Sequence, residues 1–409
     1  MPTADKRSSE AGRPRWVGPL VAVAAATLLA FAHVVVAGPY IPTDDAKVLE
    51  RLPVKPADPA ARELRDLRAR LAARPDDLDA AVRLARRYFR LALSEGDPRF
   101  IGYAEGALRP WPDGNGAPHE VLVVRALLRQ YRHDFNGALD ALAAAAAADP
   151  ADPEVPLWRA AILLVQADYA GAASACDALR RMASALDWIG CKASVDGVTG
   201  RAAPAYASLR DALARARGVR AGASLWILTR LAEFSLALDE PDRAEQHFKE
   251  ALALGMHDQF LLAAYADFLL DRGRPGEVAA LLKDWTRSDA LLLRLALAEK
   301  ALNAPGLSEH IQALQARFDA AALRGGALHQ QEEARFHLYL LGQPSRALAL
   351  ARANWALQRE PRDARILLEA ALAANDPAAA LPALDWLSRS NYEDPHLRRL
   401  AARLESIGR

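Results

Sequence analysis

Apolar residues form one uninterrupted block near the N-terminus, followed by a long series of amphipathic stretches. The block, Val17–Ala37, contains no charged side chain. At about 1.5 Å per residue a helix of this length would cover about 31 Å, enough to cross a bilayer. Basic residues precede the block, and a proline-studded stretch follows it. We therefore expect a basic cytoplasmic leader (1–16), a transmembrane helix (17–38), a proline-rich linker (39–58) and an exported domain (59–409).

The same block has two other interpretations. Leu20–Leu29 would be the apolar region of a cleaved signal peptide, because Ala30, Phe31 and Ala32 form a small-x-small cleavage site. The block would otherwise be a buried helix of a soluble protein. The membrane anchor and the cleaved signal both predict that the residues after the block leave the cytoplasm.

The amphipathic remainder repeats its small side chains at a nearly constant interval. Six alanines, at positions 126, 160, 193, 232, 266 and 301, follow one another in steps of 34, 33, 39, 34 and 35, and each has a small or β-branched partner twelve positions later. Two helices joined by a tight turn approach closely only where small side chains face each other, so the spacing predicts helix pairs. The paired positions are Ala126 with Ala138, Ala160 with Ala172, Ala193 with Ala205, Ala232 with Ala244, Ala266 with Val278, and Ala301 with Ala313.

Turn sequences such as His133-Asp134-Phe135 lie a few residues before the second member of a pair. This pattern resembles the tetratricopeptide repeat family, whose helix-turn-helix unit has about 34 residues. The family's Trp and Gly in the first helix are mostly missing here. The resemblance implies an all-α, right-handed solenoid of helix pairs over residues 76–390. The best-matching positions are Leu228, Leu231, Ala232, Ala244, Phe248 and Ala251.

Nine units are expected along the solenoid, two of them (186–222 and 289–325) degenerate. Helices at 59–73 and 393–407 would cover the two ends, because an open stack leaves its last apolar face exposed. An irregular α-helical bundle is the alternative architecture. The other seven units are expected at 77–112, 119–150, 153–185, 225–256, 259–288, 328–361 and 362–390.

Charge and motifs argue against several functions. The chain has 52 Lys and Arg against 51 Asp and Glu, so no broad basic field for nucleic acid is expected. It has no glycine-rich phosphate loop, no G-x-S-x-G and no H-E-x-x-H. We therefore predict a protein that is not an enzyme and has no cofactor or metal site. Two pairs at helical spacing, His247 with Glu250 and His329 with Glu332, would supply at most half of a metal site each.

The two cysteines are expected on consecutive helices, the second helix of one unit and the first helix of the next. Export would place Cys176 and Cys191 in an oxidising compartment, where a disulfide persists. The alternative is two separate thiols buried in small apolar slots.

The first helices of a helix-pair solenoid line its concave face, which predicts a groove for a protein or peptide partner. The layout resembles membrane-anchored bacterial members of the repeat family. It implies a scaffold or assembly factor in the bacterial inner membrane, with a single span and a periplasmic repeat domain, or a secreted periplasmic form after signal cleavage. A periplasmic holdase and an enzyme with a site hidden in the groove are the alternatives. The candidate groove residues are Trp226, Thr229, Glu233, Phe260, Asp267, Glu332, Phe336 and Tyr339.

Overall fold

The computed structural model describes residues 44, 59–114, 116–323 and 330–407. The predicted leader, the apolar segment 17–38 and His329 lie outside these residues, as does the linker 39–58 apart from Asp44. No helix in the described ranges is both long enough and apolar enough to cross a membrane. Residues 57–409 form one unit, and the description below concerns this unit.

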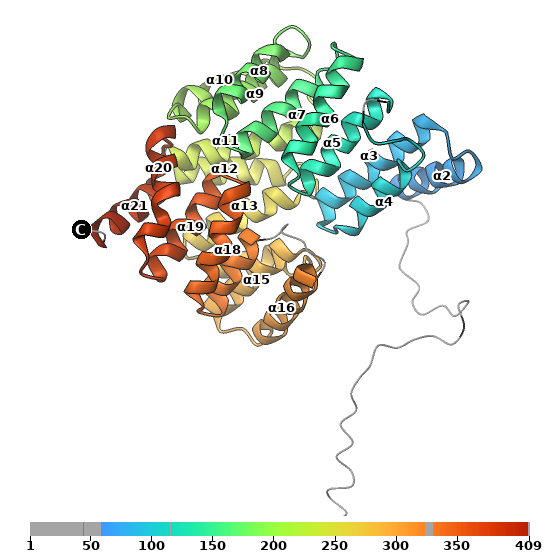
Figure 1. Cartoon of the computed structure of the whole chain (residues 1–409). Coiled ribbons are helices and arrows are strands. Elements are labelled where there is room, and N and C mark those ends of the chain that lie inside the picture. Colours follow the sequence, from blue (N-terminus) through green and yellow to red (C-terminus); the bar gives the residue numbers. More distant parts are fainter. Residues whose placement is uncertain (1–43, 45–58, 115, 324–329, 408–409) are drawn as a thin grey trace, which may run out of the picture. The chain divides into compact units, whose positions relative to one another are not determined.

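Where the structure describes the chain, it contains helices and no strands (Figure 1). This agrees with the all-α prediction. The helices are α2 (Pro59–Ala73), α3 (Leu78–Glu95), α4 (Arg99–Ala107), α5 (His119–Tyr131), α6 (Phe135–Ala148), α7 (Glu154–Val165), α8 (Tyr169–Leu179), α9 (Ala185–Gly197), α10 (Ala202–Arg215), α11 (Ala221–Ala237), α12 (Pro241–Leu252), α13 (Gln259–Asp271), α14 (Pro275–Leu282), α15 (Asp289–Leu302), α16 (Leu307–Leu323), α17 (Gln330–Arg335), the π-helical η1 (Phe336–Leu340), α18 (Pro344–Leu357), α19 (Pro361–Ala373), the 3₁₀ turn η2 (Pro377–Ala380), α20 (Leu381–Ser390) and α21 (Pro395–Ile407).

These helices pack as consecutive pairs, each pair joined by a tight turn. The first helices are α3, α5, α7, α9, α11, α13, α15, α17 with η1, and α19. Each packs against the helix that follows it, so the described residues contain nine pairs, in the order that the sequence predicts. Helix α2 packs on α3 at one end and α21 packs on α19 at the other. Leu67 of α2 and Leu397 of α21 are buried there, as expected for helices that cover apolar ends.

The turn inside each pair contains one residue with a left-handed backbone. Glycine and asparagine adopt this conformation readily, whereas Ala167 adopts it at a steric cost. Because the reversal takes a fixed number of residues, it sets the register of the two helices. The nine residues are Gly96, His133, Ala167, Gly200, Asp239, Gly273, Asn303, Gly342 and Asn375.

The left-handed residue explains the spacing of twelve between the paired alanines. In the second to the sixth pair, a small residue on the first helix lies seven positions before it, and a small or β-branched residue on the second helix lies five positions after it. Both members of all five pairs, from Ala126 with Ala138 to Ala266 with Val278, are at most 1% exposed. Small residues therefore mark the closest approach of each helix pair, as predicted.

The last of the six predicted alanine pairs, Ala301 with Ala313 in the seventh helix pair, is wrong. Ala301 is exposed and Ala313 is only partly buried. The residue seven positions before Asn303 is Ala296, which is fully buried. The preceding helix α14 is short, with only 8 residues, so the next pair begins earlier than a constant repeat length predicts.

Candidate functional site

The first helices of the pairs contact one another beyond their nearest neighbours. Asp267 of α13 pairs with Arg335 of α17 through two contacts of 2.7 and 3.0 Å. Asp271, one turn further along α13, pairs with Arg365 of α19 through two contacts of 2.7 Å. We call these interactions, together with the stacking of Arg362 on Phe260 described below, the cross-wall contacts. They occupy the surface that the sequence assigns to a groove.

Asp267 is the centre of the cross-wall contacts. Its carboxylate accepts hydrogen bonds from both Arg335 and Arg294, the latter at 2.7 Å, and the Arg294 side chain is 5% exposed. Burial opposes ionisation of Asp267, but the charges of Arg294 and Arg335 outweigh burial and hold its pKa well below the usual range. Asp267 is therefore ionised at neutral pH. Its negative charge offsets the cost of burying the positive charges of Arg294 and Arg335.

Two guanidinium groups lie close to the ring of Phe260, at the start of α13. Arg230 of α11 is 5.0 Å from the ring centroid and Arg362 of α19 is 5.6 Å from it, which are cation–π distances. Arg230 also pairs with Glu233 at 2.9 Å. Burial raises the pKa of Glu233, against the opposing effect of Arg230. Helices α11, α13 and α19 thus meet through charged and aromatic side chains.

The structure divides the eight predicted groove residues into three sets. Thr229 and Phe336 are core residues, because Thr229 is buried with its hydroxyl on the Leu225 carbonyl and Phe336 is fully buried. Trp226 and Phe260 remain 43% and 37% exposed. The polar members Glu233, Asp267, Glu332 and Tyr339 are partly buried.

A second set of long-range contacts joins early turns to late segments, and we call it the seam. The backbone N–H of Arg359 donates to the Val165 carbonyl at 2.8 Å. The backbone N–H of Ala202 donates to the Glu393 carboxylate at 2.7 Å. Gly200 lies so close to Asn391 that an added Cβ would be 2.8 Å from the Asn391 Cβ. Turns of the third and fourth pairs therefore contact the ends of α18 and α20.

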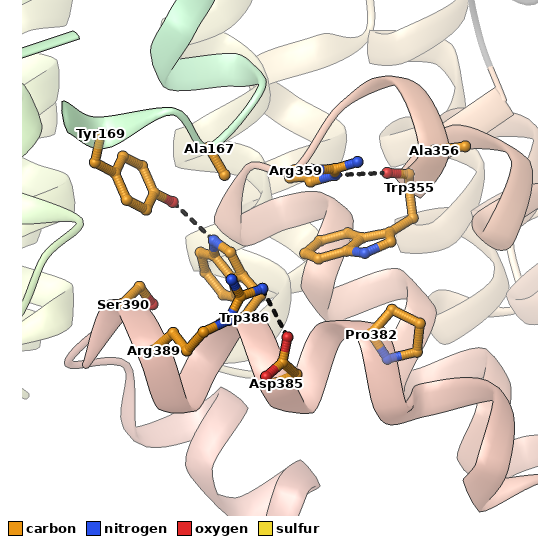
Figure 2. A pocket seen from close by; sticks show the side chains of 10 residues that line it. All are labelled: Ala167, Tyr169, Trp355, Ala356, Arg359, Pro382, Asp385, Trp386, Arg389 and Ser390. Atoms are coloured by element: carbon orange, nitrogen blue, oxygen red, sulfur yellow. Dashed lines mark hydrogen bonds and ion pairs between the residues drawn. The ribbon is translucent and has the colours of Figure 1, made fainter. Parts of the chain in front are cut away.

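The seam contains a pocket of about 400 Å³ (Figure 2). Tyr169, at the start of α8, forms one side, and Trp355 of α18 and Trp386 of α20 form the other. The two indole rings are 5.8 Å apart in an edge-to-face arrangement. The Trp386 indole N–H donates to the Tyr169 hydroxyl at 2.7 Å across the seam. The remaining lining residues are Ala167, Ala356, Arg359, Pro382, Asp385, Arg389 and Ser390.

The polar groups of the pocket are mostly donors. The Tyr169 hydroxyl accepts from Trp386, and no described group accepts its proton. Burial raises the pKa of Tyr169 to about 12, so the proton stays in place. Arg389 pairs with Asp385 at 2.6 Å. Among the described residues no carboxylate lies within ion-pair distance of the Arg359 guanidinium, whose Nε–H donates weakly to the Trp355 carbonyl at 3.4 Å.

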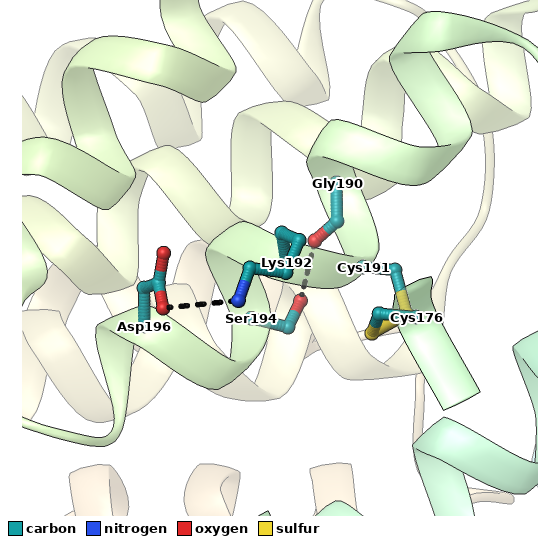
Figure 3. Close-up of a disulfide and its surroundings, with 6 residues drawn as sticks. All are labelled: Cys176, Gly190, Cys191, Lys192, Ser194 and Asp196. Atoms are coloured by element: carbon teal, nitrogen blue, oxygen red, sulfur yellow. Dashed lines mark hydrogen bonds and ion pairs between the residues drawn. A yellow bond between two sulfur atoms is a disulfide. The ribbon is translucent and has the colours of Figure 1, made fainter. Parts of the chain in front are cut away.

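A disulfide joins Cys176 of α8 to Cys191 of α9, with the α-carbons 5.5 Å apart (Figure 3). Both residues are buried. The bond links two consecutive pairs, so it ties together units that the sequence places next to each other. Of the two possibilities that the sequence leaves open, the structure contains the disulfide.

In the part of the chain that the structure describes, no three His, Cys, Asp or Glu residues lie close enough together to hold a metal ion. His247 instead bridges the Tyr206 hydroxyl at 2.9 Å and Glu250 at 3.2 Å. The predicted absence of enzyme activity and of a cofactor stays a prediction.

Sequence reasoning missed the seam and its pocket. Ala167 and Tyr169 lie at the turn between α7 and α8, but Tyr169 and its partner Trp386 are 217 residues apart. Contacts so distant in sequence leave no periodic signal. The one available hint was the occurrence of two tryptophans, Trp355 and Trp386, on consecutive second helices near the C-terminal end.

No family model and no curated protein sequence matches the chain. Solved structures show likenesses at low identity: the Cut9–Hcn1 hetero-tetramer of APC/C (14% identity, TM-score 0.49, 84% of this chain and 66% of that chain), yeast Tom70 (11%, 0.40, 85% and 85%), and the Rap protein complexed with Competence and Sporulation Factor (13%, 0.41, 85% and 98%). The chain thus spans just under two thirds of the length of the matched chain in the Cut9–Hcn1 structure. Likenesses at these scores do not establish a shared fold, so the helix-pair architecture rests on the contacts described above.

Proposed function

We propose that the protein is a non-catalytic scaffold of tetratricopeptide-like helix pairs that binds a segment of another protein. The observation that supports this most directly is the exposure of Trp226 and Phe260 on successive first helices. Exposed aromatic side chains are a small minority of a protein surface but dominate the binding energy of interfaces. The charges beside them, Arg230, Glu233 and Arg362, would orient a polar segment.

We further propose that the scaffold is held in a bacterial inner membrane by residues 17–38, with the helix pairs in the periplasm. The disulfide between Cys176 and Cys191 supports export, because disulfides form and persist in oxidising compartments and are rare in the cytosol. A tether would raise the local concentration of partners at the membrane surface. A reporter fused after residue 60 tests the topology, and activity confined to the cytoplasm would contradict it.

Site-specific photo-crosslinking tests the scaffold function. A photoreactive phenylalanine analogue would replace Trp226 in one full-length variant and Tyr103 in a matched control. Tyr103 is an aromatic of similar exposure, at 53%, on α4. We expect a discrete protein adduct from position 226 and none from position 103. Equal adducts from both positions, or none from 226, would contradict the proposal.

A further inference from the structure

The pocket at the seam combines flat apolar walls with an excess of hydrogen-bond donors. Tyr169, Trp355 and Trp386 supply the walls. The donors are the proton of the Tyr169 hydroxyl and the guanidinium groups of Arg359 and Arg389, whereas Asp385 is the only carboxylate of the lining and is already paired. The charges lining the pocket therefore leave a net positive charge, carried by Arg359.

These features match one kind of ligand group. A carboxylate only accepts hydrogen bonds and carries the complementary charge, and arginine binds it through two parallel contacts. The rings of Trp355 and Trp386 supply a large apolar surface for an aromatic or branched side chain. A volume of about 400 Å³ lies at the small end of ligand pockets, which suits one large side chain with its neighbour rather than a cofactor.

We propose that this pocket binds an acidic residue and an adjacent apolar side chain of an extended segment of a partner protein. The carboxylate contacts Arg359 and the Tyr169 hydroxyl, and the apolar side chain packs against the surface that Trp355 and Trp386 form together. The proposal rests on the proposed scaffold function and names the chemistry of the segment that it recognises.

The position of the pocket couples binding to closure of the seam. One wall comes from α8 and the other from α18 and α20 (Figure 2). A segment that contacts both walls binds only when the walls are together, and so shifts the equilibrium toward the closed seam. The backbone bond from Arg359 to Val165 lies beside the pocket and reports on this equilibrium.

Selection from a random peptide library tests the recognition. Short random peptides displayed on phage would be selected on the full-length protein and then measured individually by fluorescence anisotropy. We expect the selected peptides to share an Asp or Glu next to a large apolar residue. Arg359→Glu should weaken their binding at least about tenfold, because an attractive charge pair becomes a repulsion. Replacing the acidic residue of the peptide with Lys should restore binding to this variant.

Arg352→Glu is the matched control. Arg352 is an exposed arginine on α18, the helix that ends two residues before Arg359, and it does not line the pocket. Binding to this variant should stay within about twofold of wild type. Selected peptides that lack an acidic residue, or that bind both variants equally well, would overturn the proposal. So would a selection that yields no peptide dependent on Arg359. Because crosslinking at Trp226 does not involve the pocket, a crosslinked adduct without such peptides would leave the scaffold function standing.

Hydrogen exchange tests the coupling. Saturation with a selected peptide should slow exchange of the Arg359 amide several-fold in wild type, because this amide exchanges only when the seam opens. The peptide in which Lys replaces the acidic residue should leave the rate unchanged. An unchanged rate with the bound acidic peptide would show that binding does not involve closure.

Discussion

The interface between α11 and α12 and the seam hold the chain together by different means. Ala232, Ala244 and Phe248 meet within one pair and are fully buried, so dispersion and the hydrophobic effect dominate there. At the seam, by contrast, backbone amides, an indole N–H and a carboxylate form directed bonds, as between Trp386 and Tyr169. The first interface joins neighbours in sequence, whereas two of the seam bonds join residues that are 191 and 217 residues apart.

This difference indicates a division of roles. Apolar packing between consecutive helices is strong and forms with little loss of chain entropy, so it builds the array. Polar contacts across the array contribute less free energy, because water competes for each bond, but they specify geometry. We therefore expect substitutions within pairs to affect global unfolding, and substitutions at the seam to affect local opening.

The largest expected effect lies in the apolar packing between consecutive helices. Phe248→Ala removes a fully buried ring that contacts Tyr265 and Phe268 of the next pair. We expect the free energy of unfolding to fall by about 4 kcal/mol, measured by urea denaturation of the full-length protein. Phe260→Ala is the control, since its ring is 37% exposed, and it should cost about 1 kcal/mol. Equal losses would contradict the distinction between the apolar packing of consecutive helices and the cross-wall contacts.

The disulfide is expected to have the next largest effect. Replacing Cys176 and Cys191 together with alanine removes a link between residues separated by 15 positions. The chain-entropy model gives a loss of about 3 kcal/mol for a loop of this size. The denaturation midpoint of wild type should fall similarly with a reducing agent, whereas the double variant should not respond to it. A response of the variant would show that the reductant acts elsewhere.

The sequence was sufficient for the helix pairs because their contacts are local. Ala126 and Ala138 lie seven positions before and five after His133, and that spacing is visible in the sequence. The prediction from alanine spacing failed at Ala301, because alanine is abundant and because the short helix α14 makes the next helix pair begin earlier. The nearby Ala296 could have been found only by placing Asn303 as the left-handed turn residue.

The candidate site was less predictable, for two reasons. Helical spacing places Thr229 on the predicted groove face of its helix, but it cannot show that Thr229 is buried in the folded protein. The sequence therefore could not separate core residues from surface residues on that face. Asp267 pairs with Arg294 and Arg335, which lie 27 and 68 residues away in the sequence. The sequence contains many arginines, and nothing in it singles out these two as the partners. Neither the cross-wall contacts nor the seam follow from the repeat.

Asp267→Asn tests the cross-wall contacts. The variant leaves Arg294 and Arg335 without their counter-charge, and we expect a loss of about 2 kcal/mol at pH 7, below the usual cost for a fully buried pair because the Asp267 side chain is a quarter exposed. Asp271→Asn is the control, since that carboxylate is 45% exposed, and it should cost under about 1 kcal/mol.

The effect of Asp267→Asn should depend on pH in a defined direction. The pKa of Asp267 is lower in the folded protein than its ordinary value of 3.8. Its stabilisation is therefore fully present above about pH 4 and is lost as the pH falls below that value. The difference between wild type and variant should shrink from about pH 4 downward. A difference that stays constant throughout the acid range would show that the charge of Asp267 is not its source.

Two glycines at equivalent turns isolate the contribution of the seam. Gly200 and Gly273 both have a left-handed backbone, with φ of 73° and 67°. An added Cβ at Gly273 meets nothing within 4 Å, whereas at Gly200 it meets Asn391. Gly273→Ala should cost about 1 kcal/mol for the backbone alone, and Gly200→Ala about 1 kcal/mol more. Hydrogen exchange of the Ala202 amide should speed up only in Gly200→Ala, and equal behaviour of the two variants would contradict the close approach at Gly200.

The smallest expected effect is a gain, at the turn that borders the pocket. Ala167 has a φ of 60°, which costs a residue with a Cβ about 1 to 2 kcal/mol. Glycine removes this strain but loses about 0.4 to 1 kcal/mol through the greater freedom of the unfolded chain. Ala167→Gly should therefore stabilise the protein by about 0.5 kcal/mol in urea denaturation, whereas Ala160→Gly, in the interior of α7, should destabilise it by about 1 kcal/mol. If Ala167→Gly is destabilising instead, the Cβ of Ala167 contributes more to the packing of the seam than its backbone strain costs.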